Sequence, residues 1–169
     1  MKETLRVLNE LEQTGVIGRY AIGGAVAAIF YMEPFLTYDL DVFVVLPATG
    51  RALITLAPIY DALRKRGYTE EGECINIEGV PVQFLPAYNA LVEEALDRAV
   101  EISYENTPTR VLRAEHLIAI MLETARDKDR QRFAAFVQQA KFDEMYLLDI
   151  LHRHGLETRY HEWKGITPS

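Results

Sequence analysis

Cysteine, basic charge and long apolar runs are all scarce in this chain of 169 residues. The single cysteine, Cys74, cannot form an internal disulfide, and no basic and then apolar leader opens the sequence. The formal net charge of −7 at pH 7 argues against an extensive basic surface for nucleic acid, although it leaves a local basic patch open. No apolar run approaches the roughly 20 residues that a membrane-spanning helix requires. We therefore expect a cytoplasmic protein that is not inserted in a membrane.

Hydrophobic residues, by contrast, make up 49% of the sequence, which is enough for one substantial core. Residues 1–113 alternate short apolar runs with helical spacing, which predicts an α/β domain. From residue 114 onward apolar residues return only every three or four positions, which predicts helices. No linker rich in Gly, Ser or Pro separates the two parts. We therefore expect residues 114–169 to form a helical appendage packed on the first part.

The most informative stretch is residues 20–45, YAIGGAVAAIFYMEPFLTYDLDVFVV. A short apolar strand leads into Gly23 and Gly24, and a run of good helix formers follows over residues 25–31 until Pro34 stops it. Because glycine has no Cβ, the backbone N–H groups of such a turn can approach a phosphate closely, and the following helix points its positive end at the same anion. A Gly-Gly pair alone is most often only a tight turn. Its meaning therefore depends on the chemistry that lies nearby.

Two aspartates open the second apolar run of this stretch. Because residues two apart in a strand point to the same face, Asp39 and Asp41 would lie side by side with Cα atoms roughly 6.6 Å apart. Leu40, Val42 and Val44 would face the core. Two carboxylates at that distance repel each other unless a cation lies between them, and hard divalent ions such as Mg²⁺ take oxygen ligands of this kind. The pair therefore predicts a metal site close to the glycine turn.

The Gly23-Gly24 turn, the short helix and the Asp39-x-Asp41 pattern together resemble the nucleotidyltransferase superfamily typified by DNA polymerase beta. Thr37, two residues before the first aspartate, matches the Thr or Ser common there. The resemblance implies a mixed-sheet α/β (α+β) fold in which the turn and Thr37 bind a nucleoside triphosphate and the two aspartates bind Mg²⁺ (or Mn²⁺). It also implies transfer of a nucleoside monophosphate to a hydroxyl group, with metal ions that stabilise the attacking and leaving oxygens.

The family's third carboxylate falls on a later strand, in the phrase VPVQFLP, where this chain has Gln83. A neutral amide is a weaker Mg²⁺ ligand than a carboxylate and is not a base near neutral pH. Three alternatives follow: Glu73 or Glu78 supplies the missing charge, Asp39 and Asp41 sustain slow transfer by themselves, or the protein binds nucleotides without turnover. For both glutamates, a solvated position in a hairpin is the competing interpretation.

The segment VLRAEHLIAIMLETARDKDRQRF is similar to a helix of the nucleotidyltransferase-like proteins related to the abortive-infection toxins of bacterial toxin–antitoxin systems. Those proteins often carry the phrase Arg-x-Lys-Asp at the end of that helix, and Arg126, Lys128 and Asp129 match it. Met121 and Arg132 stand where the family has a lysine and an aspartate. This narrower resemblance leaves an antitoxin partner open.

Charge alone also singles out this segment, because Arg126, Lys128, Arg130 and Arg132 form the densest basic cluster of the chain. On a helix, the first and third of these residues lie on one face and the second and fourth on another, which argues against a single concentrated patch. Two interpretations stay open, a solvated and salt-bridged face or a clamp for a triphosphate or RNA. Lys128 is the preferred nucleotide-binding candidate of the four.

The remaining pattern predicts the elements around these residues. We expect helices over Lys2–Gln13 and residues 52–66, 91–99, 115–125, 129–140 and 142–154, and strands over Cys74–Ile77 and residues 80–85, 100–104 and 110–112. His152 and His154 lie two apart and do not share a helix face, so they do not indicate a metal site.

Three functions are weighed from these observations. The first is an enzyme that transfers a nucleoside monophosphate from a triphosphate to a hydroxyl of an unidentified acceptor, with RNA and protein both open. The second is a catalytically degenerate relative that binds a nucleotide or a partner protein. The third is an unrelated α/β adaptor in which the two motifs are accidental. The oligomeric state, including a homo-oligomer, is left open.

Overall fold

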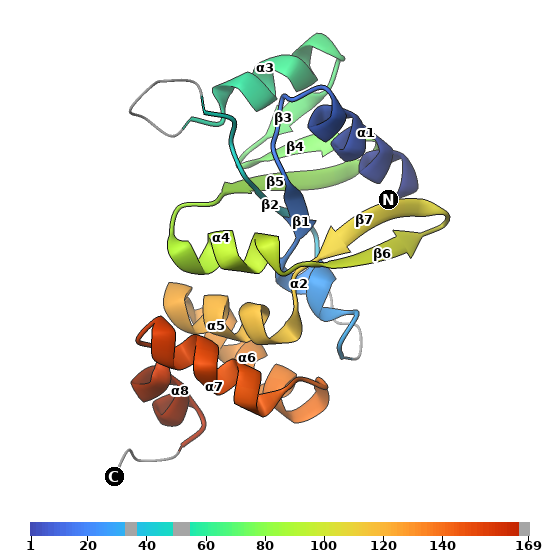
Figure 1. Ribbon diagram of the computed structural model, residues 1–169. Coiled ribbons are helices and arrows are strands. Elements are labelled where there is room, and N and C mark those ends of the chain that lie inside the picture. The colour runs from blue at the N-terminus through green and yellow to red at the C-terminus, as the bar shows by residue number, and fades with distance from the viewer. Residues whose placement is uncertain (33–36, 49–54, 166–169) are drawn as a thin grey trace.

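The computed structural model describes residues 1–32, 37–48 and 55–165, and within them it contains seven strands and eight helices (Figure 1). The strands are β1 (Tyr20–Ile22), β2 (Leu40–Val44), β3 (Thr69–Glu71), β4 (Cys74–Ile77), β5 (Val80–Pro86), β6 (Val100–Tyr104) and β7 (Thr107–Val111). The helices are α1 (Lys2–Gln13), α2 (Gly24–Ala28), α3 (Ala57–Lys65), α4 (Ala90–Asp97), α5 (Ala114–Thr124), α6 (Asp127–Gln139), α7 (Glu144–Arg153) and α8 (Glu157–Trp163).

All seven strands form one mixed sheet in the order β3-β4-β5-β2-β1-β7-β6. β2 pairs with β5 and β1 pairs with β7 in parallel, and the other neighbours are antiparallel. On β2, Leu40, Val42 and Val44 are fully buried, so the predicted core face of this strand is confirmed. The parallel register places Asp41 opposite Gln83 on β5. The predicted fold class, a mixed-sheet α/β fold followed by helices, is confirmed.

Helix α1 has the predicted bounds and covers one end of the sheet (Figure 1). Its leucines at helical spacing, Leu5, Leu8 and Leu11, are each at most 1% exposed. Polar contacts fix the position of the helix, because the Thr4 hydroxyl donates to the Ile77 carbonyl at 3.1 Å and the Asn9 amide donates to a β7 carbonyl at 2.9 Å. The amino-terminal helix is therefore anchored on both halves of the sheet.

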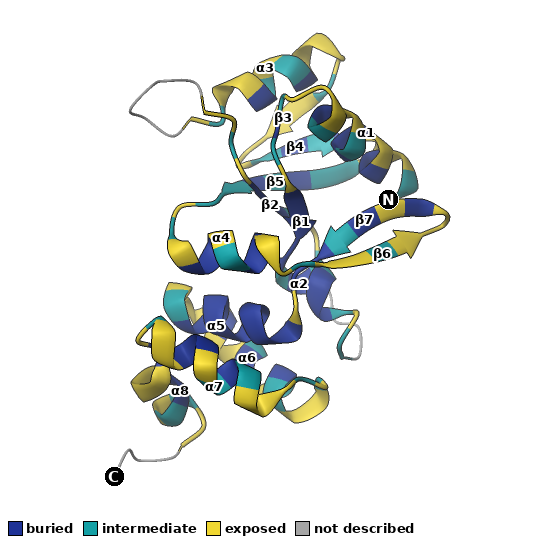
Figure 2. Ribbon diagram, viewed as in Figure 1, coloured by how far each residue is buried: buried dark blue, intermediate teal, exposed yellow. Residues whose placement is uncertain are grey.

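Helix α5 is the centre of the carboxy-terminal helices, and Figure 2 shows it dark along most of its length. Every residue from Ala114 to Leu122 is buried, as expected of a helix that is apolar on nearly all sides. Its buried carboxylate, Glu115, accepts a hydrogen bond from the backbone of Asp143 at 2.7 Å. No described helix is long and apolar enough to cross a membrane.

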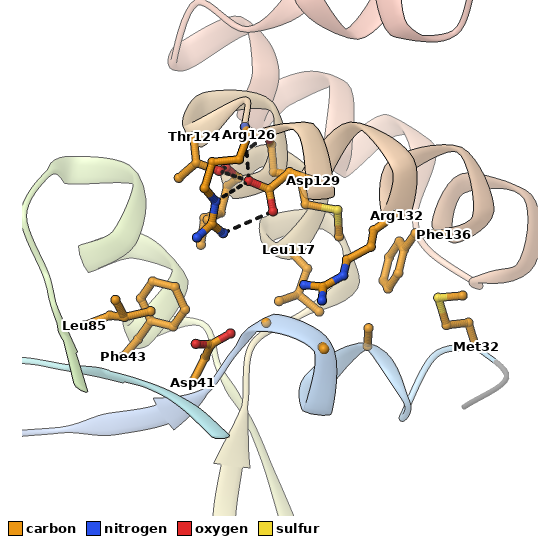
Figure 3. A pocket seen from close by; sticks show the side chains of 15 residues that line it. Met32, Asp41, Phe43, Leu85, Leu117, Thr124, Arg126, Asp129, Arg132 and Phe136 are labelled. Carbon is orange, nitrogen blue, oxygen red and sulfur yellow. Dashed lines mark hydrogen bonds and ion pairs between the residues drawn. The ribbon is translucent and has the colours of Figure 1, made fainter. Parts of the chain in front are cut away.

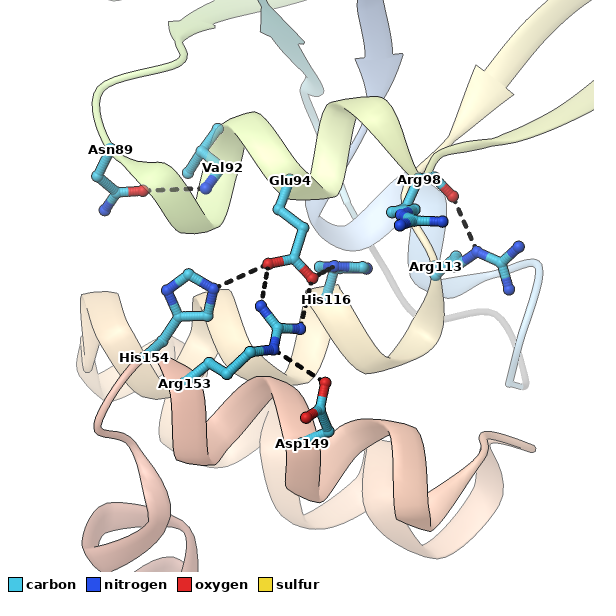
Figure 4. A network of polar contacts seen from close by, with 9 residues as sticks. All are labelled: Asn89, Val92, Glu94, Arg98, Arg113, His116, Asp149, Arg153 and His154. Carbon is cyan, nitrogen blue, oxygen red and sulfur yellow. Dashed lines mark hydrogen bonds and ion pairs between the residues drawn. The ribbon is translucent and has the colours of Figure 1, made fainter.

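A polar network on Glu94 joins α4 to the carboxy-terminal helices (Figure 4). Its carboxylate accepts two hydrogen bonds from Arg153 at 2.6 and 2.9 Å, and it contacts ring nitrogens of His154 at 3.0 Å and His116 at 3.2 Å. The hydrogen bonds from Arg153 contribute most to holding the pKa of Glu94 well below its usual range. His116 is fully buried in this network, which indicates a structural role.

The structure departs from the sequence prediction mainly at short or exposed elements. β3 was not expected, because its three residues are all exposed and carry no apolar alternation. The turn between β6 and β7 falls at Glu105 and Asn106, which both have positive φ, so β7 begins at Thr107 and not at residue 110. Helix α8 also went unpredicted. The expected helix stop at Pro34 and the expected helix start at residue 52 lie outside the described residues.

Candidate active site

The glycine turn between β1 and α2 lies directly against β2. The Gly23 amide donates to the backbone carbonyl of Asp41 at 2.9 Å. A Cβ at Gly23 would overlap the Phe43 ring, and a Cβ at Gly24 would overlap the Asp41 carboxylate. Gly24 also has φ +56°, a region that side chains disfavour. Both glycines are therefore required for the turn to approach the aspartate strand, whatever else binds there.

The two predicted aspartates lie close together at the start of β2. Asp41 is the second residue of the strand, whereas Asp39 precedes it, so the expected strand carries only the second of the two aspartates. Burial raises the pKa of Asp41 from its ordinary 3.8 to about 6, and the charge of Asp39 adds to this shift. The Thr37 hydroxyl donates to the backbone carbonyl of Asp39 at 3.3 Å. Thr37 thus shapes the loop that carries Asp39.

Helix α6 brings basic side chains to the same place from a distant part of the sequence. Lys128, Arg126 and Arg132 all lower the pKa of Asp41, although they do not overcome its burial and the charge of Asp39. Lys128 and Arg132 line one groove, in keeping with the shared helix face expected of them, whereas Arg126 does not lie on a helix face. The reason is that Arg126 is the residue that precedes the helix and does not follow its helical spacing.

Asp129 fixes the start of α6, and Figure 3 shows it beside Arg126, with Arg132 further along the helix. Its buried carboxylate accepts hydrogen bonds from the Thr124 hydroxyl at 2.8 Å, from the Arg126 backbone at 3.3 Å and from the Arg126 guanidinium at 2.7 and 3.1 Å. Burial works against ionisation, but the hydrogen bonds from Arg126 and Thr124 outweigh it and lower the pKa of Asp129. The sequence pattern marked Asp129 only by resemblance, and its role as a helix cap was missed.

Two concave spaces border the aspartates. A small cavity of about 40 Å³ lies between α2, β2, α5 and α6, with Asp41, Phe43, Arg126 and Arg132 among its lining residues (Figure 3). A wider groove of about 480 Å³ is lined by Thr37, Tyr38, Asp39, Glu71, Cys74, Pro81, Lys128 and Arg132. The predicted residues Thr37, Asp39 and Lys128 therefore face one groove, and Gly24 and Asp41 face the adjoining cavity.

Gln83 lies beside Asp41, as the alignment of the hairpin with the family predicted. Its amide donates to the Glu73 carboxylate at 3.2 Å. The other candidate, Glu78, lies at the far turn of the β4–β5 hairpin, where it accepts a hydrogen bond from the Tyr68 hydroxyl at 2.7 Å. Of the two glutamates, only Glu73 is held next to the residue that neighbours Asp41.

The donor set fits a divalent cation that is shared with a substrate. Within residues 1–32, 37–48 and 55–165, no group of three or more His, Cys, Asp or Glu side chains could hold a metal ion by itself. Asp39 and Asp41 would offer carboxylate oxygens, and Mg²⁺ is commonly bound by one or two carboxylates plus the phosphates of a nucleotide. Burial first and the charge of Asp39 next raise the pKa of Asp41, and a cation bound to the pair would favour its ionised form.

The likeness to known proteins concerns the whole chain. No family model and no curated protein sequence matches it. Among solved structures it is similar to an antigenic nucleotidyltransferase-like protein from Paracoccidioides brasiliensis, with a TM-score of 0.51, 11% identity, and 99% of this chain and 94% of that chain covered. It is also similar to ANT(2")-Ia in complex with adenylyl-2"-tobramycin, with a TM-score of 0.50, 15% identity and coverage of 92% and 98%. A solution structure of the same antibiotic-resistance factor gives a TM-score of 0.50 at 14% identity, with coverage of 98% and 97%. These likenesses extend over nearly the whole of each chain, and they show that the protein has the nucleotidyltransferase fold.

Proposed function

We propose that the protein is a nucleotidyltransferase that binds Mg²⁺ (or Mn²⁺) and a nucleoside triphosphate and transfers a nucleoside monophosphate to a hydroxyl acceptor. The observation that carries the proposal is that Asp39 lines a groove with Lys128 and Arg132, while Asp41 lines the adjoining cavity, which Arg132 also borders. The carboxylates suit a divalent cation, and Lys128 and Arg132 suit an anionic phosphate chain. The fold of the solved relatives supports this choice over an unrelated adaptor.

In this proposal each residue has a defined task. Asp39 and Asp41 hold the cation, which when bound neutralises charge on the transferring phosphate. Because Gly23 and Gly24 have no Cβ atoms, a phosphate can approach the backbone of their turn. Lys128, which lines the groove, positions the triphosphate. We also propose that residues 1–113 form the nucleotide-binding part and that residues 114–169 form an appendage, whose helix α6 closes the site. RNA, a protein or a small molecule would each supply a hydroxyl acceptor.

A transfer assay tests the proposal directly. The protein is incubated with labelled nucleoside triphosphates, Mg²⁺ and total RNA, in parallel with the Asp39→Asn/Asp41→Asn variant. Label transferred by the wild type and absent in the variant supports the enzyme. Calorimetry of the triphosphate with and without Mg²⁺ runs beside the assay, so that binding is measured even where no transfer occurs. Absence of both transfer and metal-dependent binding overturns the proposal.

One observation favours a second candidate, a relative that binds nucleotides without turnover. Gln83 occupies the position beside Asp41 from which a carboxylate would complete the site, and a neutral amide cannot accept the proton of an attacking hydroxyl. In this case the triphosphate binds with Mg²⁺ but no label is transferred to any acceptor. The resemblance to toxin-related proteins makes a protein partner a candidate ligand for such a relative, and co-purification with the neighbouring gene product would test it.

A further inference from the structure

A hydroxyl acceptor must lose its proton when it attacks a phosphorus atom, and the two aspartates are already assigned to the cation. A positioned carboxylate is a suitable general base for that proton. The question is therefore which other carboxylate the fold brings to the row of side chains that contains Asp41. This step rests on the proposed transfer reaction.

The sheet register identifies that row. Asp41 on β2 lies opposite Gln83 on β5, and in a parallel pair the two side chains point to the same face. On the other side of β5, Ile75 pairs with Val82, so continuing the antiparallel register by one residue places Cys74 opposite Gln83. The row thus runs from Asp41 through Gln83 to Cys74. The opposite face carries buried core residues, which leaves this face for the groove.

Glu73 precedes Cys74 and is held to this row through its carboxylate and to α3 through its backbone. Its carboxylate accepts the hydrogen bond from the Gln83 amide at 3.2 Å, and its backbone carbonyl accepts one from the Tyr60 hydroxyl at 3.4 Å. The charges of Asp39, Asp41 and Glu73 all reach the Cys74 thiol, whose pKa is raised by burial first and by these carboxylates next. Glu71 adds a fourth charge at the Cys74 thiol and lines the groove with Asp39, but it is Glu73 that accepts the hydrogen bond from Gln83. Glu73 differs from the aspartates because it is exposed and can meet an incoming acceptor.

We propose that Glu73 is the general base of the transfer reaction and that Gln83 is the residue that positions it. The acceptor's O–H bond breaks, its proton moves to the Glu73 carboxylate, and its oxygen forms a bond to the α-phosphorus of the nucleoside triphosphate. The bond between that phosphorus and the bridging oxygen breaks, and pyrophosphate leaves with the electron pair. The amide of Gln83 thus does not replace a carboxylate but holds one.

An exchange of the two side chains tests this assignment. Glu73→Gln is expected to lower kcat by about 10²- to 10⁴-fold, the usual contribution of a general base. The affinity for the triphosphate should stay within about threefold, because Glu73 acts on the acceptor. The double variant Glu73→Gln/Gln83→Glu keeps an amide and a carboxylate in hydrogen-bonding distance of each other. Its kcat should be about tenfold or more above that of Glu73→Gln. Glu78→Gln, an exposed glutamate of the same hairpin, is the matched control and should stay within about twofold.

Formate added to a Glu73→Ala variant gives a second readout that a purely structural role would not change, since a small carboxylate can enter the space left by the side chain and accept the proton. Rescue that saturates with formate, and that is absent in Glu78→Ala, supports the base. If the wild type transfers label and Asp41→Asn does not, while Glu73→Gln remains fully active, the inference fails and the proposed function stands. A Glu73→Gln loss that neither the exchange nor formate restores also overturns the inference. No transfer by the wild type refutes both.

Discussion

Replacing Asp41 with asparagine is expected to stabilise the metal-free protein at neutral pH, although the same change should abolish transfer. Burial and the charge of Asp39 raise the pKa of the Asp41 carboxyl from 3.8 to about 6, so ionisation of this group opposes folding. A shift of about two units corresponds to about 3 kcal/mol. Because Asp41 retains some exposure to solvent, we expect a gain of about 1–2 kcal/mol. Asparagine has the same shape and adds no atom against Gly24.

The sign of the effect follows from the direction of the shift. Below about pH 4 the carboxyl is protonated in both the folded and the unfolded chain, so aspartate and asparagine should give similar stability. Between about pH 4 and 6 the unfolded chain ionises first, and the wild type loses stability relative to Asp41→Asn. Above about pH 6 the difference is complete and constant. The stability of the wild type relative to Asp41→Asn therefore falls between about pH 4 and 6, because asparagine does not titrate.

Urea unfolding at pH 4 and pH 8 in the presence of a chelator measures this difference. A gain of 1–2 kcal/mol corresponds to a rise in Tm of about 2–8 °C for a chain of this size. Asp97→Asn, which changes an exposed carboxylate at the end of α4, is the control and should shift stability by no more than about 0.5 kcal/mol at either pH. Millimolar Mg²⁺ should stabilise the wild type and leave Asp41→Asn unchanged. A destabilised Asp41→Asn at pH 8, or a gain that is equal at both pH values, would refute the reasoning.

Three further changes probe the surroundings of the site. Gly24→Ala should destabilise the fold by about 2–4 kcal/mol in urea unfolding, more than Gly15→Ala, since both have positive φ but only the former would overlap a carboxylate. Glu94→Gln should cost about 2–3 kcal/mol at pH 7, because it leaves the cations around it without their counter-charge, and this difference should shrink below about pH 4, where the carboxylate protonates first in the unfolded chain. Asp129→Ala should speed hydrogen exchange in the first turn of α6 and cost about 1–2 kcal/mol, whereas Asp127→Ala, at an exposed position of the same turn, should do neither.

Local pattern was sufficient for most of the fold. The amphipathic spacing of α1 and the hairpin that carries Gln83 were predictable because hydrophobic periodicity and turn residues encode them within a few positions. β3 was not predictable because all three of its residues face solvent. The full burial of α5 was also hidden, since it depends on α2, α4, α6 and α7, which pack around it, and not on its own spacing.

Of the candidate site, the glycine turn and the aspartates were the part that one continuous stretch of sequence could predict. Gly24 and Asp41 lie 17 positions apart in the sequence and could be read as one motif, whereas Lys128 and Cys74 reach the neighbouring groove from other parts of the chain. Long-range contacts of this kind leave no periodic trace in the sequence. The cap at Asp129 decides where Lys128 lies, and it was visible in the sequence only as part of a charged run.

The balance of charge around Asp41 explains why the proposed cation and the proposed phosphate would depend on each other. Arg126, Lys128 and Arg132, at the start of α6 or just before it, lower the pKa of this carboxyl, yet burial and the charge of Asp39 keep it raised. A divalent ion between Asp39 and Asp41 would remove that repulsion, and the same basic residues would then be left facing a site of reduced negative charge. A triphosphate would supply the anion that this arrangement requires, and it would add oxygens where the described part of the chain offers no group of three His, Cys, Asp or Glu side chains for a metal ion. It follows that calorimetry should find each of the two ligands bound more tightly in the presence of the other, by the same factor in both directions.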